Sequence, residues 1–287
     1  MKKFGRHFIT VFIILLFLAG ILIFSFPYVS NIIHTRTQSR VIESYQDSVN
    51  KADENYLDEL IEVAREYNKT LRNNPQRFHK TEDELRQYHN MLRIEDEVVE
   101  GVIGSLEIEK VGINLPIYRG TDDAILRIGA GHIEGTSLPV GGSGTHTVIT
   151  GHRGLHTAKL LTDIDRMGVG DLFTLNILNL RLHYITDQIE IVLPDDFSMI
   201  AICADNDYAT LLTCTPIGVN THRLLIRGIR IPDSELPGVD FTIEEYQLNI
   251  IEYIKLYMLF MSFLLLLILL YILVKKALRK NKQNKRK

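Results

Sequence analysis

The sequence predicts a mainly β domain, a barrel or a sandwich, preceded by a helical segment and flanked by two transmembrane helices. Three observations lead to this fold class: apolar alternation of period two in the middle of the chain, helical periodicity before it, and an uncharged apolar run near each end. Of the 287 residues, 46% are hydrophobic and 23% are charged, which excludes wholesale disorder. Two cysteines are too few for a disulfide scaffold or a cysteine-rich zinc module.

Two uncharged stretches of nineteen residues, Phe8–Phe26 and Leu256–Val274, are each long enough to cross a bilayer as a helix. The alternative for the first is a cleaved signal peptide, but Pro27-Tyr28-Val29-Ser30 follows it in place of a small-residue cleavage site. The alternative for the second is a buried core helix, which its all-round apolar character and the basic tail after it disfavour.

Charge is divided unevenly along the chain, and this predicts the topology. Residues 1–27 hold three basic residues, residues 275–287 hold eight, and neither segment has an acidic one. Residues 28–252 carry a formal charge of −15, which argues against a nucleic-acid partner. Because lysine and arginine stay on the cytoplasmic side, we predict a two-pass cell-membrane protein with both termini cytoplasmic and the centre extracellular.

The predicted organisation has seven parts. They are a basic tail (1–7), an anchor (8–27), an extracellular helical region (28–100), a β-domain (101–234), a juxtamembrane segment (235–255), a second span (256–274) and a basic tail (275–287). In the helical region, apolar positions from Leu57 to Leu71 recur every three or four residues, as in an amphipathic helix. Asn73-Asn74-Pro75 stops that helix, and Thr81 with Glu84 has capping-box spacing for a second one.

From Gly101 the apolar period changes to two, with a break at Gly112, and turn-forming residues punctuate the chain. The expected strands are Val102–Ile108, Leu115–Tyr118, Thr145–Thr150, Leu172–Leu178, Leu180–Leu193, Thr210–Cys214 and Arg223–Ile231. Between them only Thr121–Ile128 and His156–Met167 have a helical pattern. Many short strands with few helices favour a barrel or sandwich of about 130 residues.

The most informative stretch is residues 210–228, where an apolar, β-branched run ends at Cys214. A hairpin folded about Gly218–Val219 would place Cys214 opposite Arg223. Since strands alternate faces, only one of His222 and Arg223 can share the face of the cysteine. A neighbouring cation favours the thiolate, which is the nucleophilic form of a thiol.

A second stretch, residues 148–161, places His152 just after a strand and a glycine. A histidine at a strand end can approach a thiol that lies on another strand. Together, a nucleophile, a proton donor and a fixed cation can carry out acyl transfer on a peptide carbonyl.

Less reactive roles stay open for these residues. A lone cysteine in a strand is usually a small buried hydrophobe, which is our interpretation of Cys203 and the alternative for Cys214. A disulfide between the two is a further alternative, because extracellular compartments are oxidising. We expect no metal site, since no carboxylate or Cys-x-x-Cys frame accompanies the clustered histidines His146, His152 and His156.

Residues 101–232 resemble the sortases, membrane-bound cysteine transpeptidases of Gram-positive bacteria. The resemblance is carried by GAGHIEGTSLPVGG (129–142), VITGHRGL (148–155) and TCTPIGVNTHRLLIRG (213–228). THRLLIRG and the second predicted span are similar to class C, the pilus-building sortases. The resemblance implies a closed sortase-type β-barrel and a reaction that needs no cofactor.

Carried over residue by residue, Cys214 matches the family's nucleophile, His152 its general acid and base, and Arg223 the arginine that stabilises the oxyanion. His222 and His132 match positions that the family does not use directly, and we expect His132 to be a polar core or loop histidine. The resemblance implies LPXTG-type pilin or surface-protein substrates, cleaved through a thioester and joined to a pilin lysine. The alternatives are an acceptor amine on cell-wall peptidoglycan, or a non-enzymatic, membrane-tethered assembly module.

One feature departs from class C. Its members usually carry a lid with an Asp-Pro-aromatic tripeptide over the cysteine, whereas residues 73–100 contain Asn74-Pro75-Gln76 and no such tripeptide. Either this region covers the cleft through other contacts or the site is open.

Overall fold

The computed structural model describes residues 2–72, 74–79, 81–96 and 99–236, together with residues 257, 261, 264 and 275. The chain forms two compact units, Met1–Val239 and Asp240–Lys287. The predicted second membrane span and the basic tail after it belong to the second unit and, apart from those four positions, lie outside the described residues.

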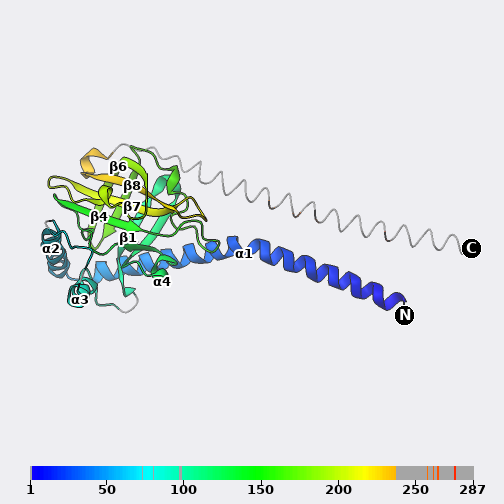
Figure 1. Cartoon of the computed structure of the whole chain (residues 1–287). Coiled ribbons are helices and arrows are strands. Elements are labelled where there is room, and N and C mark those ends of the chain that lie inside the picture. The colour runs from blue at the N-terminus through cyan, green and yellow to red at the C-terminus, as the bar shows by residue number, and fades with distance from the viewer. Residues whose placement is uncertain are drawn as a thin grey trace, which may run out of the picture. The chain divides into compact units, whose positions relative to one another are not determined.

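A closed barrel of eight strands forms the body of the first unit, which confirms the predicted barrel architecture (Figure 1). The order around the barrel is β1-β2-β3-β4-β7-β8-β6-β5. The pairs β2–β3 and β4–β7 are parallel, and the other neighbours are antiparallel. The strands are Val102–Ile108 (β1), Ile113–Arg119 (β2), Ala130–His132 (β3), Thr145–Thr150 (β4), Leu172–Ile177 (β5), Leu180–Val192 (β6), Asp207–Thr215 (β7) and His222–Ile231 (β8).

Of the two helical segments expected within the barrel domain, one contains a helix and the other does not. Thr121–Ile128 contains a short helix, α4, at Asp123–Leu126. The prediction for His156–Met167 is wrong, because this segment consists of turns and one 3-10 turn at Ile164–Arg166. Leu160 has φ +43°, a left-handed backbone conformation that no right-handed helix can accommodate.

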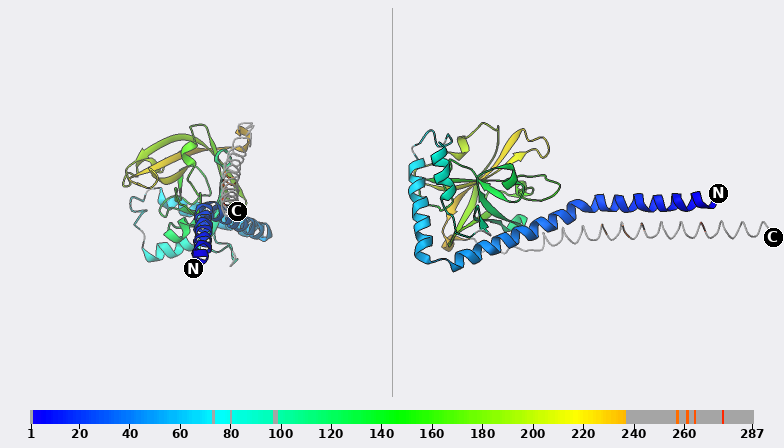
Figure 2. Two further views of the ribbon diagram at one scale, coloured as in Figure 1. Left: turned by 90° about the vertical axis from the view of Figure 1, so that its right-hand side faces the viewer. Right: turned by 90° about the horizontal axis from the view of Figure 1, so that it is seen from below.

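Three helices precede the barrel: α1 (Lys2–Lys51), α2 (Glu54–Leu71) and α3 (Glu82–Asn90). The C-terminal part of α1 runs alongside the barrel, and α2 turns sharply away from the end of α1, with α3 beside it (Figure 2). The capping box predicted from Thr81 and Glu84 is present at the start of α3. Helix α2 ends before Pro75, as predicted.

The inward-facing side chains of the barrel form one apolar core with the packed sides of the helices. In α2 the buried positions recur at helical spacing, at Leu57, Ile61, Ala64, Asn68 and Leu71. Asn68 is polar, and its amide exchanges two hydrogen bonds, of 3.0 and 2.7 Å, with the backbone of Leu138. The helical layer is therefore part of the folded domain.

Helix α1 also contains an apolar stretch that extends away from the barrel. Among the described residues, one helix is long and apolar enough to cross a membrane. The candidate span lies within Leu15–Lys51 of α1 and contains a window of mean hydropathy 2.0, of which none is buried. Its location agrees with the predicted anchor at residues 8–27, and Pro27 lies inside the continuous helix.

Tyr45 joins α1 to strand β1 and to the turn between β5 and β6. Its hydroxyl donates to the carbonyl oxygen of Ile103 at 2.8 Å and accepts from the backbone N–H of Leu178 at 2.9 Å. Its side chain is only 2% exposed, and burial raises the pKa of the phenol further above its ordinary value. Removing the hydroxyl would leave two buried backbone groups without this partner.

We expect Tyr45→Phe to lower the free energy of unfolding by about 1–3 kcal/mol, the usual cost of buried polar groups left unpaired. Tyr56→Phe is the matched control, because the Tyr56 hydroxyl donates to the Arg93 carbonyl at 3.0 Å on the surface. The control should cost less than about 1 kcal/mol. Denaturant unfolding of the full chain in detergent measures both, and equal losses would contradict the buried role of Tyr45.

Candidate active site

The β7–β8 hairpin brings Cys214 and Arg223 together. The two residues are direct cross-strand partners, as the predicted hairpin requires. The turn between them uses left-handed backbone at Gly218 (φ +79°) and Asn220 (φ +60°), the residue types that adopt it most readily. Cys214 is a free thiol of intermediate exposure, so it is open to solvent.

Arg223 is held at the hairpin end by backbone oxygens. Its Nη1 donates to the carbonyls of Asn220 at 3.2 Å and His222 at 3.1 Å. A guanidinium has five N–H donors, so these contacts leave donors for a further acceptor. Arg223 is the cross-strand partner of Cys214 and therefore shares its face of the sheet. His222, the preceding residue, is on the opposite face.

His152 follows the end of β4, the strand that pairs in parallel with β7. The last paired residues are Thr150 and Leu212, so His152 and Cys214 each lie two residues beyond the same register position. Side-chain hydrogen bonds hold the two strand ends together: Thr150 donates to the Leu212 carbonyl at 3.0 Å, and Thr213 donates to the Gly151 carbonyl at 2.8 Å. The three predicted site residues therefore lie on β7, on β8 and just after the end of the adjacent strand β4.

A carboxylate that the sequence analysis did not single out contacts the imidazole. Oδ1 of Asp123, at the start of α4, lies 3.1 Å from Nε2 of His152, and its Oδ2 accepts from Nε of Arg127 at 2.7 Å. These two hydrogen bonds hold the pKa of Asp123 below its usual value, and the bond from Arg127 has the larger effect. The pair Asp122-Asp123 before a short helical pattern was the signal in the sequence, but nothing there indicated its distance from His152.

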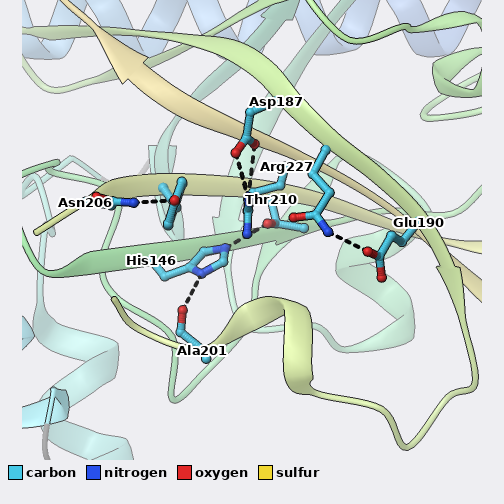
Figure 3. Close-up of polar contacts among 9 residues, drawn as sticks. His146, Asp187, Glu190, Ala201, Asn206, Thr210 and Arg227 are labelled. Carbon is cyan, nitrogen blue, oxygen red and sulfur yellow. Dashed lines mark hydrogen bonds and ion pairs between the residues drawn. The ribbon is translucent and has the colours of Figure 1, made fainter. Parts of the chain in front are cut away.

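The outer face of the sheet leads from this site along β4, β7 and β8. Figure 3 shows His146 on this face between Thr210 and the backbone of Ala201, beside the ion pair of Asp187 and Arg227. The loop between β6 and β7 borders the face: its residues Met199 and Ile200 pack on apolar side chains of β4 and β8.

Comparisons with known proteins identify the family of this fold. The family model of the sortase domain matches residues 106–231. Sortase C1 of Streptococcus agalactiae is 45% identical over 68% of this chain and 99% of that chain, with a TM-score of 0.65. The chain belongs to the sortase family, in class C. Sortase C of Streptococcus pneumoniae is 44% identical over 67% and 97% of the two chains, with a TM-score of 0.60.

A curated relative, sortase D of Bacillus subtilis, is 30% identical over 131 residues. That match covers 45% of this chain and 63% of the relative, so it spans less than two thirds of sortase D.

Residues 74–79 lie in the region where class C sortases usually carry the lid tripeptide. This segment packs on the β6–β7 loop. Arg77 donates to the Ile200 carbonyl at 3.0 Å, and the rings of Phe78 and Phe197 have centroids 5.6 Å apart. The same segment also lies close to Gly135 in the connection between β3 and β4, where a Cβ would lie 2.5 Å from the Arg77 carbonyl oxygen. Residues 74–79 of this sortase therefore touch the loop that borders the sheet face.

The interpretation of Cys203 as a small buried hydrophobe is wrong. Cys203 is exposed, because it lies in the loop between β6 and β7 and not in a strand. Cys203 and Cys214 are both free, so the alternative of a disulfide is not realised.

The expectation for His132 is confirmed: it is fully buried and polar. Its ring nitrogens contact the Tyr88 hydroxyl at 2.8 Å and the Ser137 carbonyl at 2.8 Å, which anchors α3 to the barrel.

Because both cysteines are free and reach solvent, we expect iodoacetamide to add two carbamidomethyl groups to the full chain without prior reduction. Intact-mass spectrometry of detergent-purified protein measures this number, and peptide mapping assigns the groups to Cys203 and Cys214. A chain that takes up no label until it is reduced would contradict the structure.

His146 should make the stability of this sortase depend on pH. Its Nδ1 donates to the Ala201 carbonyl at 2.9 Å and its Nε2 accepts from the Thr210 hydroxyl at 2.7 Å, so the neutral ring satisfies both contacts. Burial, with the nearby Arg227 and Arg77, lowers the pKa of His146 to about 4 from about 6.5. The unfolded chain then binds the proton more readily, so stability is lost as pH falls from about 6.5 to about 4.

The loss over that window should reach about 3 kcal/mol from this residue. Denaturant unfolding of the full chain at a series of pH values measures it. In the control, His146→Gln, the slope between these pH values should flatten to what the other titrating groups contribute, among them the carboxylates and His183, whose pKa burial also lowers. An unchanged slope would refute the assignment to His146.

Proposed function

We propose that this sortase is a membrane-anchored cysteine transpeptidase that cuts an LPXTG-like sorting signal and joins the acyl part to a lysine of a pilin subunit. The observation that carries the proposal is the register that pairs Cys214 with Arg223 and ends the adjacent strand β4 two residues before His152. The sortase C structure from Streptococcus pneumoniae provides insights into pilin substrate specificity, and another relative, 37% identical with a TM-score of 0.62, is sortase C1 of a pilus island. These relatives support a pilin as the substrate.

In the first half-reaction, the thiolate of Cys214 attacks the threonine carbonyl carbon of the sorting signal and forms a C–S bond. The carbonyl oxygen becomes an oxyanion, to which the guanidinium of Arg223 donates hydrogen bonds. As the peptide C–N bond breaks, His152 gives its proton to the leaving amine. A thioester on Cys214 remains.

In the second half-reaction, the amine of an acceptor lysine attacks the thioester carbon, and His152 takes the proton that the amine loses. The C–S bond then breaks and returns the electron pair to the sulfur. One peptide bond is exchanged for one isopeptide bond, so the reaction needs neither a redox partner nor a cofactor.

Membrane anchoring fits this reaction. We propose that the apolar part of α1 and the predicted second span, residues 256–274, hold the enzyme by two passes, with the barrel outside and both termini in the cytoplasm. Substrates that carry a sorting signal would be tethered to the same membrane face. Shared anchoring raises the effective concentration of the partners and offsets a weak affinity for a short peptide.

The test uses the full chain in detergent, a sorting peptide of the LPXTG type and a lysine-bearing acceptor peptide. We expect a mass adduct on Cys214 and an isopeptide product. Cys214→Ala should abolish both, while Cys203→Ala, which removes the other free thiol, should leave both intact. Arg223→Lys should lower kcat/KM by at least about 100-fold, because a point charge does not replace a planar donor fork.

Product formation by Cys214→Ala would overturn the proposal. A wild-type chain whose Cys214 forms no adduct with any sorting peptide would favour the non-enzymatic module. An adduct that only peptidoglycan amines resolve would favour cell-wall anchoring over pilin polymerisation.

A further inference from the structure

The structure assigns a positioning role to Asp123: its carboxylate accepts a hydrogen bond from Nε2–H of His152 and leaves Nδ1 as the ring nitrogen that exchanges protons during catalysis. This inference rests on the proposed function of His152 and extends it to a residue on a different element. The contact joins Oδ1 and Nε2 at 3.1 Å across 29 positions of sequence.

The carboxylate is held from two sides. Oδ1 faces His152, and Oδ2 accepts from Nε of Arg127 at 2.7 Å, one helical turn further along α4. With one oxygen engaged by each partner, rotation of the carboxylate would break one contact or the other. Arg127 therefore orients Asp123 as Asp123 orients the imidazole.

The barrel topology fixes the distance between the two residues. Helix α4 is the connection between β2 and β3, which pair in parallel at Ile117 and Ala130. Strand β3 in turn pairs with β4, with Gly131 opposite Thr150, two residues before His152. Asp123 and His152 thus belong to segments that the pairing of β2, β3 and β4 places next to each other at one rim of the barrel.

A neutral imidazole has two tautomers, and only one of them suits a given proton transfer. With the proton on Nε2, directed at Asp123, the lone pair of Nδ1 is free to accept a proton from the thiol of Cys214 or from the acceptor amine. Without the carboxylate the two tautomers mix, and the ring can turn. A carboxylate in this position also stabilises the imidazolium that forms in each half-reaction.

The charges around His152 set the size of the effect. It is flanked by Asp123 from α4, by Cys214 at the end of β7 and, across the hairpin from that thiol, by Arg223 on β8. The side chains of His152 and Asp123 are 31% and 64% exposed, so water screens their attraction. We therefore expect an effect near tenfold and not the loss of activity that follows from removing the nucleophile.

The experiment measures transpeptidation by the full chain in detergent. Asp123→Asn should lower kcat about tenfold with KM within about twofold of wild type, because the change acts on proton transfer and not on peptide binding. Asp123→Glu keeps the charge and should recover part of the loss.

Asp122→Asn is the matched control. Asp122 is the neighbouring exposed carboxylate and makes no capping hydrogen bond at the start of α4, so its change removes the same charge and should alter kcat by less than about twofold.

Selective ¹⁵N labelling of histidine supplies a readout that a purely structural role would not move. In the wild type, the neutral His152 ring should carry its proton on Nε2, and in Asp123→Asn the population should shift toward Nδ1. Wild-type kcat in Asp123→Asn, or an unchanged tautomer, would overturn the inference while leaving the proposed function intact, provided that Cys214→Ala is inactive in the same assay. Activity of Cys214→Ala would instead refute the proposed function itself.

Discussion

The parallel pairing of β4 with β7 is the constraint on which the site depends. Those strands are joined residue by residue from Thr145 with Asp207 to Thr150 with Leu212, and His152 and Cys214 each lie two residues beyond that last pair. Because side chains alternate between the two faces of a strand, a slip of one residue would turn Cys214 into the barrel interior. The antiparallel register of β7 with β8 adds Arg223 opposite the thiol. A site assembled from three adjacent strands needs both registers at once.

The same strands serve stability on one face and chemistry on the other. Residues of β4, β7 and β8 that point inward, such as Ile149, Leu211 and Ile226, are fully buried in the core. The intervening residues point outward and form the outer face, on which the β6–β7 loop packs. Inward packing of the apolar set therefore holds the outward set in register, which ties the precision of the site to the stability of the barrel.

The helical layer and the short connections determine what surrounds that face. Tyr45 and Asn68 fasten the helices to the barrel through buried hydrogen bonds to backbone groups. Arg77 then reaches the β6–β7 loop from the segment between α2 and α3. Asp123 reaches His152 from the connection between β2 and β3. Arg77 and Asp123 therefore each reach, from a distant part of the sequence, a loop or a strand end beside the sheet face that leads from Cys214.

Local pattern in the sequence determined the features that depend on near neighbours. The limits of β4, the capping box of Thr81 and the pairing of Cys214 with Arg223 all follow from spacings of fewer than ten residues. The resemblance to sortases assigned His152, which pattern alone could not have joined to a thiol 62 positions away. Tertiary structure decided the rest, including the exposed loop position of Cys203 and the contact of Asp123 with His152. The physical reason is that parallel pairing and rim contacts join segments whose separation in sequence leaves no periodic signal, so only the closed barrel brings them together.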